Sequence, residues 1–337
     1  MKKTRKQNRR YLWVVQLVVL ILIILALVAA FHIWKKSQVS NSEPQIPQED
    51  GDIEVLFCQT SNCTLAALNF MDTADKYLYC ALYDLDLKEL INKLLEKSTN
   101  TDVKLYTDNA NFINLSFERT DKIGPLMHNK FCVADDSRIF TGSFNPTSND
   151  AYRNDNNMLI IKSDILAGNY KDEFLELYNR EPARKVQNPI VKIGGTTIEN
   201  YFCPEDNCAD RISDAIYSAK KSIYFMEFSF TSDKIANAMA ARFADGIEVK
   251  GVFERRNVDS DAKMQLLLNQ GANVKMDGNK YNLHHKVIII DSEIVITGSM
   301  NPSMNGDERN DENILIIHDK NIADLYTQEF LRVWNLG

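Results

Sequence analysis

Two blocks of the sequence repeat a set of residue types that can carry out chemistry on a phosphate ester. Both blocks place a His, a Lys two residues later, an Asp seven residues after the His, and then a Gly-Ser-x-Asn turn. The first block holds His128, Lys130, Asp135, Gly142, Ser143 and Asn145, and the second holds His284, Lys286, Asp291, Gly298, Ser299 and Asn301. On a strand, residues two apart point to the same face, so each block sets an imidazole beside an ammonium group. A lone His-x-Lys pair would be weak evidence, whereas two copies at matched spacing favour a functional site.

Cleavage of a phosphodiester needs this combination of groups. The phosphorus needs a nucleophile and the departing oxygen needs a proton, and two imidazoles on opposite sides can supply both. We expect the two Lys, the two Asn and the Ser hydroxyls to hold the nonbridging oxygens as charge builds in the transition state. Asp135 and Asp291 fit a structural role better than proton transfer. The predicted catalytic residues are thus His128, Lys130, Asn145, His284, Lys286 and Asn301, supported by Asp135, Ser143, Asp291 and Ser299.

The two blocks belong to an internal duplication. The segment IEVLFCQTSNC at residues 53–63 recurs as IENYFCPEDNC at residues 198–208, in the same order relative to the His-Lys blocks. In the first half we expect strands at 77–83 and 103–107 with a helix at 87–97 between them. In the second half the equivalent strands are at 223–230 and 249–253, with a helix at 234–243. Amphipathic segments close the halves at 165–178 and 322–334. This alternation predicts βαβ units and a largely parallel sheet.

At the two blocks the chain resembles the phospholipase D superfamily, whose signature is HxKxxxxD followed by GSxN. The resemblance covers nearly all of residues 53–337. It implies a duplicated α/β fold of two βαβ-type lobes with mixed, mostly parallel sheets and one composite active site at a pseudo-twofold interface. It also implies catalysis through a covalent phosphohistidine without a cofactor, a metal ion or an oligomer. By the family's usual order His128 attacks, and His284 protonates the leaving group and then activates water.

One position departs from the family pattern. Family members commonly carry a carboxylate that orients each catalytic His, and Glu312 lies 28 residues after His284. The matching position after His128 is Asn156, which can accept a hydrogen bond but cannot stabilise an imidazolium by charge. We therefore expect Glu312 to be catalytic beside His284 and to favour its protonated form, and Asn156 to be a supporting residue beside His128.

The N-terminal segment predicts a membrane anchor. Residues 11–34 carry no formal charge over 24 residues, and about 20 helical residues cross a bilayer core. Six basic residues in the tail 1–10 put the N-terminus in the cytoplasm by the positive-inside rule. A cleaved signal peptide is the alternative, although its apolar region is usually only about 7–15 residues long. The sequence thus predicts a single-pass cell-membrane protein with an extracytoplasmic catalytic domain.

Composition divides the rest of the chain. Residues 35–52 are polar and aperiodic and predict a flexible stalk. We expect lobe 1 at 53–181, a connection at 182–197 with a hairpin turn at Gly194-Gly195, and lobe 2 at 198–337. Residues 1–36 carry eight Lys/Arg and no Asp/Glu, which leaves 31 basic against 46 acidic residues, a formal charge of −15, after them. So acidic a domain disfavours an extended basic nucleic-acid surface.

The spacing of the cysteines fits a catalytic domain that lies outside the cytoplasm. Four residues separate Cys58 from Cys63, and four separate Cys203 from Cys208. Two local disulfides are the natural interpretation outside the cytoplasm. A four-Cys zinc site fits this spacing poorly, and free thiols are the remaining alternative. Cys80 and Cys132 lie in apolar strand patterns and are expected to be small buried hydrophobes without a chemical role.

The substrate is the least determined part of the prediction. Members of the superfamily act on phospholipids or nucleic acids with the same motif. The anchor and the acidic domain favour a phosphoric diester hydrolase acting on a phospholipid head group. A membrane-anchored nuclease is the alternative, with Arg255 and Arg256 as a local phosphate contact or simply a solvated loop. A cardiolipin synthase is less favoured because such proteins usually have two N-terminal membrane helices. A catalytically inactive scaffold is a further alternative, supported only by Asn156.

Overall fold

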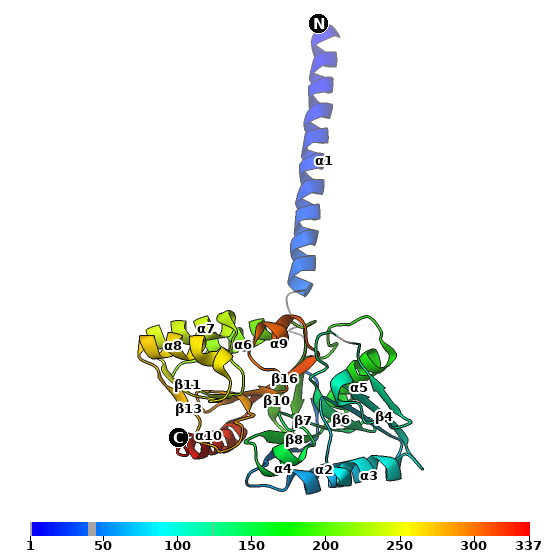
Figure 1. Cartoon of the computed structure of the whole chain (residues 1–337). Helices are drawn as coiled ribbons and strands as arrows, with labels where there is room; N and C mark the ends of the chain where they lie inside the picture. Colours follow the sequence, from blue (N-terminus) through cyan, green and yellow to red (C-terminus); the bar gives the residue numbers. More distant parts are fainter. Residues whose placement is uncertain (1, 40–44, 123) are drawn as a thin grey trace. The chain divides into compact units, whose positions relative to one another are not determined.

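The structure of the chain, a computed structural model, describes residues 2–39, 45–122 and 124–337 (Figure 1). They belong to two compact units, Met1–Ile46 and Pro47–Gly337.

The N-terminal unit is built on the helix α1 (Lys2–Val39). Residues Trp13–His32 form a stretch of 20 residues with a mean hydropathy of 3.2 and no burial within the protein. By length and composition this helix can cross a membrane, and a signal sequence would meet the same criteria. The helix is longer than the predicted anchor, because it also takes in the basic tail and residues 35–39 of the predicted stalk.

The second unit contains both lobes, and each lobe is organised around one mixed sheet. Among the described residues, the lobe 1 sheet has seven strands in the order β2 (Ile53–Phe57), β8 (Asn157–Lys162), β7 (Arg138–Gly142), β6 (Lys130–Ala134), β3 (Tyr77–Leu82), β4 (Asp102–Thr107), β5 (Glu118–Thr120). Within the same described part, the lobe 2 sheet has nine strands in the order β1 (Gln48–Glu49), β9 (Ile190–Ile193), β10 (Thr196–Cys203), β16 (Glu312–His318), β15 (Ile294–Gly298), β14 (Lys286–Ile290), β11 (Ser222–Glu227), β12 (Glu248–Phe253), β13 (Asn273–Met276).

The predicted α/β class and mixed sheets are confirmed, but the expectation of mostly parallel pairing is wrong. The strands β3, β4 and β5 pair in parallel in lobe 1, as do β11, β12 and β13 in lobe 2. The motif strands instead form antiparallel hairpins, β6 with β7 and β14 with β15. A hairpin connection of a few residues is too short for a parallel crossover, which needs a dozen or more.

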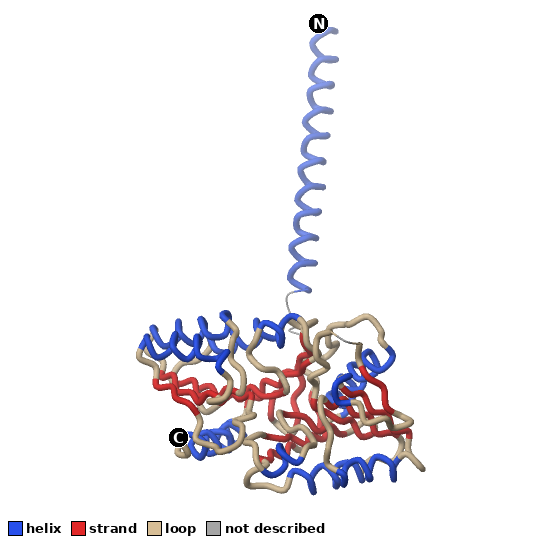
Figure 2. The backbone as a smooth tube through the Cα atoms, in the orientation of Figure 1, coloured by secondary structure: helices blue, strands red, loops and turns tan. Residues whose placement is uncertain are grey.

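Helices cover both faces of each sheet (Figure 2). Lobe 1 carries α2 (Cys63–Asp72), α3 (Lys88–Lys97), α4 (Ser148–Tyr152) and α5 (Asp164–Asn179), and lobe 2 carries α6 (Cys208–Tyr217), α7 (Asp233–Ala244), α8 (Asp261–Gln270), α9 (Met304–Glu308) and α10 (Lys320–Trp334). Short 3-10 turns lie at Asn109–Asn111 and Val258–Ser260. The side chains of Ser163 and Asp319 cap α5 and α10 at equivalent positions of the two halves.

The central core joins the two lobes. It contains inward-facing residues of both sheets together with Tyr170 and Phe174 of α5 and Tyr326 and Phe330 of α10. Two outer cores lie under α2 and α3 in lobe 1 and under α6, α7 and α8 in lobe 2. The helix α5 contacts the motif strands β6 and β7, and α10 contacts β14 and β15, so both helices connect a motif hairpin to this shared core.

The predicted stalk needs a correction at its C-terminal end. Gln48 and Glu49 form β1, which pairs in parallel with Lys192 and Ile193 of β9. Glu49 also accepts a hydrogen bond from Ser163, so this segment is fixed to the catalytic unit. Residues 40–44 of the predicted stalk lie outside the described residues. The predicted turn at Gly194-Gly195 does connect β9 to β10, with both glycines at positive φ.

All six cysteines form disulfide bonds within the described part of the chain. Cys58–Cys63 and Cys203–Cys208 are the two predicted local bridges. The third bridge, Cys80–Cys132, corrects the prediction of two unpaired hydrophobic cysteines. These two residues face each other in the register of the antiparallel pair β3–β6, with Cα atoms 4.0 Å apart.

We expect this third bridge to stabilise the protein more than either local bridge. It closes a sequence separation of 52 residues, against 5 for the others. Constraint of the unfolded chain should then be worth about 4 kcal/mol for Cys80–Cys132 and about 2 kcal/mol for each short loop. Urea unfolding of the double variants Cys80→Ala/Cys132→Ala and Cys58→Ala/Cys63→Ala would measure the difference. Equal loss of unfolding free energy in the two variants would contradict the loop-length argument.

Candidate active site

The two motif histidines lie on one cavity between the lobes. His128 precedes β6 of lobe 1 and His284 precedes β14 of lobe 2, and both line a cavity of about 450 Å³. Backbone bonds across the interface fix both residues: the His128 N–H donates to Asp311 O at 2.9 Å, and the His284 N–H donates to Asp155 O at 2.7 Å. The structure therefore brings both predicted histidines to one cavity.

His128 is held by a carboxylate from the opposite lobe. Both carboxylate oxygens of Glu312 lie 2.8 Å from His128 Nδ1. Ser299 donates a hydrogen bond to Glu312 at 2.7 Å, which fixes this carboxylate in turn. Burial lowers the pKa of His128 below its ordinary value, although the Glu312 charge opposes the shift. With Nδ1 engaged, Nε2 is the ring nitrogen left for the cavity.

The predicted pairing of Glu312 with His284 is therefore wrong. A separation of 28 residues along the chain suggested a partner within lobe 2, but Glu312 crosses the interface to the other lobe. Asn156, expected beside His128, instead donates hydrogen bonds to the backbone carbonyls of Asp150 and Asn154. It anchors the segment that carries Asp150.

Asp150 takes the place of the second carboxylate. Its Oδ2 lies 3.2 Å from His284 Nδ1, an ion-pair distance without good hydrogen-bond geometry. Asp150 also accepts hydrogen bonds from Asn145 and Asn154. Burial opposes ionisation of this carboxyl, but His284 and these donors outweigh it and lower its pKa. Burial lowers the pKa of His284 to about 4.

The two motif lysines lie beneath the histidines. Lys130 Nζ donates to His128 O and Lys286 Nζ donates to His284 O, each at 2.7 Å. Both side chains are almost fully buried. Burial lowers the pKa of Lys130 to about 8, and burial together with repulsion by Lys130 lowers the pKa of Lys286 to about 7. Each Nζ thus lies next to a histidine that lines the cavity, and a positive charge so close favours a phosphate group there.

The amides and hydroxyls of the Gly-Ser-x-Asn turns divide into two groups. Asn145 and Asn301 line the cavity, and the Oδ1 atom of each has no hydrogen-bond partner within the described residues. Ser143 and Ser299 lie behind the cavity, where they accept hydrogen bonds from the backbone N–H groups of Asn157 and Asn313. The serines were expected to hold substrate oxygens, and their contacts instead connect neighbouring strands and, for Ser299, position Glu312.

Asp135 and Asp291 lie at the far ends of the motif strands. Asp135 accepts hydrogen bonds from the N–H groups of Asp75, Lys76 and Tyr77 at 2.8–3.1 Å. Asp291 makes the equivalent set of bonds with residues 220–222 at 2.6–2.9 Å. These contacts are those of structural residues, which agrees with the role expected from the sequence.

Three cavity residues were missed by sequence reasoning. The ring of Tyr83 packs edge-on against His128 with centroids 4.8 Å apart, and Phe228 packs in the same way against His284 at 5.1 Å. Both follow equivalent strands, β3 and β11, so aligning the two halves would have found them. The third residue, Asp150, aligns with Gly306 and thus had no repeated partner to reveal it.

Comparisons with known proteins agree with this geometry. A family model described as cardiolipin synthase, PLD-like domain, matches residues 61–178 and again residues 212–334. A phospholipase D of Rickettsia bellii is 32% identical over 169 residues, which cover 48% of this chain and 84% of that protein. Mitochondrial cardiolipin hydrolase of Xenopus tropicalis is 29% identical over 136 residues, or 39% of this chain and 65% of that protein.

A solved structure extends the likeness to most of the chain. Phosphatidylserine synthase of Haemophilus influenzae matches over 83% of this chain and 86% of its own, with a TM-score of 0.61 at 15% identity. At that identity the likeness concerns the fold alone. Because the PLD-like domain matches both halves, and each half supplies one motif histidine to the same cavity, the chain belongs to the phospholipase D-like phosphodiesterase family.

Proposed function

We propose that the protein is a membrane-anchored hydrolase that cleaves the head-group phosphodiester of a phospholipid through a covalent phosphohistidine. The observation that carries the proposal is the pair of imidazoles on one cavity, each with a carboxylate at Nδ1 and a buried lysine beneath it. In this arrangement one imidazole can attack phosphorus while the other faces the departing oxygen.

The proposed reaction has two steps. Nε2 of one His forms a bond to phosphorus as the bond to the leaving oxygen breaks, and the second His gives its proton to that oxygen. The second His then takes a proton from water, which attacks phosphorus, releases the phosphomonoester and restores the first His. Lys130, Lys286, Asn145 and Asn301 stabilise the charge on the nonbridging oxygens.

His128 is the proposed nucleophile. Both oxygens of Glu312 contact its Nδ1, which fixes the ring and offsets the positive charge that a phosphohistidine acquires. His284 then carries the proton. Its pKa of about 4 in the free enzyme will rise when an anionic diester binds beside it, because a neighbouring negative charge favours the imidazolium.

The membrane location rests on α1. A helix of this hydropathy with a basic N-terminal tail fits a single cytoplasm-to-outside crossing of the cell membrane. Three disulfides in the other unit fit an oxidising compartment outside the cytoplasm. A lipid substrate fits this location, and relatives of the chain are named phospholipase D and cardiolipin hydrolase.

A nuclease is the second candidate, favoured by the rim of the cavity. Arg256 donates to Asn282, which lines the cavity, at 2.7 Å. Arg153 and Lys280 lie over the ring of Tyr281, 5.4 and 5.8 Å from its centroid. Exposed basic and aromatic side chains of this kind can bind a single strand of nucleic acid. The guanidinium groups of Arg255 and Arg256 also bond to backbone carbonyls of residues 279 and 280, which gives them a structural role.

Assays with lipid and nucleic-acid substrates distinguish the lipid hydrolase from the nuclease. The purified full chain in detergent should hydrolyse bis-p-nitrophenyl phosphate and release head groups from phosphatidylcholine or cardiolipin micelles. Single-stranded DNA and RNA are the competing substrates. Cleavage of nucleic acid with intact lipid would replace the lipid proposal by the nuclease, and failure on all substrates would favour a scaffold.

We expect activity to decline on the alkaline side. The lysine pKa values of about 8 and about 7 mean that both ammonium groups lose their charge as pH rises from 7 to 9. Since the charged forms stabilise the transition state, kcat/KM for bis-p-nitrophenyl phosphate should fall by roughly tenfold or more over that range. Steady-state rates in matched ionic strength would measure it. A flat profile up to pH 9 would mean that the lysines stay charged or do not contribute.

We also expect activity to survive excess EDTA. The two imidazoles supply both nucleophile and acid, so the proposed steps need no metal-bound water. Among residues 2–39, 45–122 and 124–337, no group of three or more His, Cys, Asp or Glu side chains is arranged to hold a metal ion. Rates before and after chelation should agree. Loss of activity that a divalent ion restores would exclude the two-histidine mechanism as written.

A further inference from the structure

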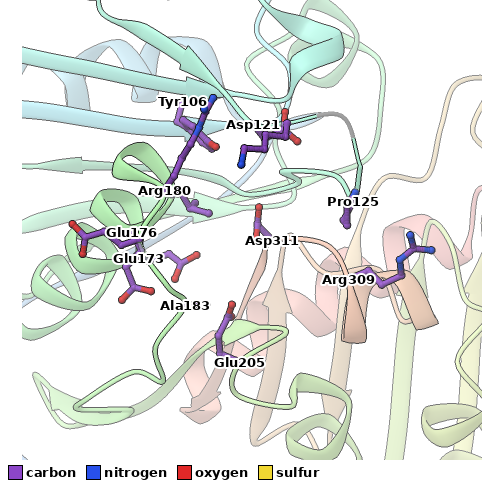
Figure 3. A pocket seen from close by; sticks show the side chains of 13 residues that line it. Tyr106, Asp121, Pro125, Glu173, Glu176, Arg180, Ala183, Glu205, Arg309 and Asp311 are labelled. Atoms are coloured by element: carbon purple, nitrogen blue, oxygen red, sulfur yellow. The ribbon is translucent and has the colours of Figure 1, made fainter.

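A second cavity lies between the lobes, and acidic side chains line much of its wall (Figure 3). It has a volume of about 330 Å³ and is lined by Glu173 of α5, by Asp121 and Glu205 from loops, and by Asp311 next to Glu312. The backbone carbonyl of Asp311 accepts the hydrogen bond from the His128 N–H. The cavity therefore adjoins the segment that positions one catalytic histidine.

Three acidic side chains of this wall, Glu173, Glu205 and Asp121, leave a carboxylate oxygen without a hydrogen bond among the described residues. Glu173 is only 7% exposed, and its carboxylate makes no hydrogen bond or ion pair with any described residue, although it lines the cavity. One carboxylate oxygen of Glu205 and one of Asp121 are also buried without a hydrogen bond in the described part of the chain. Buried carboxylates are normally paired, because isolation from water is costly.

The duplicated half provides a direct comparison. Aligned on the two His-Lys blocks, Glu173 corresponds to Glu329 and Asp311 corresponds to Asp155. In this second pair, which also spans the two lobes, the guanidinium of Arg332 contacts both Glu329 and Asp155 and so joins the two carboxylates. The residue that corresponds to Arg332 on α5 is Glu176, which forms its ion pair with Arg184 instead. Among the described residues, no cation is therefore bonded between Glu173 and Asp311 as Arg332 is between Glu329 and Asp155.

We propose that this cavity binds a small organic cation whose guanidinium or primary ammonium group lies between Glu173 and Asp311, as the Arg332 guanidinium lies between Glu329 and Asp155. Charge-assisted hydrogen bonds to two carboxylates would hold the cation. Tyr106, Leu177 and Ala183 supply apolar wall for a short carbon chain. This binding site is separate from the phosphodiester chemistry.

An organic cation fits better than a metal ion. The carboxylates do not form a group of three that could hold a metal among the residues described. The cavity volume of about 330 Å³ is also far larger than a dehydrated ion needs. A guanidinium spreads its charge over a planar fork that can reach carboxylates on two walls.

Binding should release protons. Burial and the neighbouring carboxylates raise the pKa of Glu173 well above its ordinary value and raise the pKa of Asp311 to about 7. The basic residues at this cavity are Lys122, Arg180 and Arg309. They are exposed to solvent, so their charges do not cancel the rise in the pKa of Glu173 and Asp311. Because the cation needs ionised carboxylates, its affinity should increase as pH rises from 6 to 8.

Calorimetric titration of the full chain in detergent tests the proposal, with butylguanidine as the probe and its neutral analogue butylurea as the ligand control. We expect saturable binding of butylguanidine alone, with heats at pH 6.5 that vary with the ionisation enthalpy of the buffer. Glu173→Gln should weaken binding at least about tenfold, since one of two charge-assisted contacts is lost. Asp311→Asn gives an independent second variant.

The duplication also supplies the sharpest variant. Glu176→Arg introduces the residue of the other half and should abolish butylguanidine binding by placing a guanidinium in the site. Glu176→Gln is the matched control, which breaks the Arg184 contact without adding a cation and should still bind. Absence of saturable binding in the wild type, equal affinity for butylurea, or unchanged affinity in Glu173→Gln and Glu176→Arg would overturn the proposal. Tight binding of calcium chloride that displaces butylguanidine would reassign the cavity to a metal ion.

Discussion

His128→Ala and His284→Ala should each reduce turnover of bis-p-nitrophenyl phosphate by at least roughly 10³-fold, and the double variant should be little worse than either. Each lobe supplies one imidazole to the shared cavity, and two residues that act in one reaction give non-additive losses. Steady-state kinetics on folded protein, checked by circular dichroism, would measure the effect. His318→Ala is a suitable control, because His318 is an exposed residue paired with Glu199.

The two single variants should differ in what they accumulate. With an activated leaving group that needs no proton, His284→Ala should still form the adduct on His128, and the adduct should persist because water activation is lost. His128→Ala should form none. Peptide mass analysis after an alkaline quench would locate the modification, since phosphohistidine is labile in acid. An adduct on His284 would reverse the proposed roles, and near-normal activity in either variant would exclude the composite site.

The repeated residues were the part of this protein that its sequence predicted well. Matched spacing around His128 and His284 indicated a duplication, and the resemblance to the phospholipase D superfamily implied that both motifs meet at one interface. The local bridges Cys58–Cys63 and Cys203–Cys208 were predictable for the same reason. Strand direction was not predictable from alternating helices and strands, because the hairpins β6–β7 and β14–β15 reverse the chain within a few residues.

Contacts between distant segments were beyond the sequence. Glu312 follows His284 in the chain, yet it bonds to His128 because Asp311 pairs with Met127 across the interface and brings Glu312 beside that histidine. Cys80 and Cys132 lie on strands whose pairing was not known, so each alone resembled a buried hydrophobe. Asn156 drew attention as a missing carboxylate, but its replacement, Asp150, lies six residues earlier on the short helix α4. Comparison of equivalent positions in the two halves could not identify Asp150, because lobe 1 carries its carboxylate at a different position from lobe 2.

Asp150→Asn should lower kcat by roughly 10²- to 10⁴-fold, the range expected when acid–base catalysis is lost. Asp150 is the carboxylate that faces His284 Nδ1, so it positions that ring and favours its protonated form. Pre-steady-state kinetics with bis-p-nitrophenyl phosphate would distinguish this role from a general loss of structure. The burst of p-nitrophenol should persist, since attack by His128 needs no acid for this leaving group, while steady-state turnover falls. Loss of burst and turnover together would indicate a damaged fold.

The lobe 2 arrangement offers a rescue of that variant. Lobe 2 has Gly306 where lobe 1 has Asp150, and Glu312 where lobe 1 has Asn156, so each lobe carries one carboxylate at one of the two positions. Asp150→Gly alone should be as inactive as Asp150→Asn. Adding Asn156→Glu should raise turnover at least about tenfold above that of Asp150→Gly. Position 156 corresponds to position 312, from which Glu312 reaches His128, so the new carboxylate should reach His284. If Asn156→Glu gives no recovery in the Asp150→Gly background, Asp150 acts through its bonds to Asn145 and Asn154 rather than through a charge beside His284.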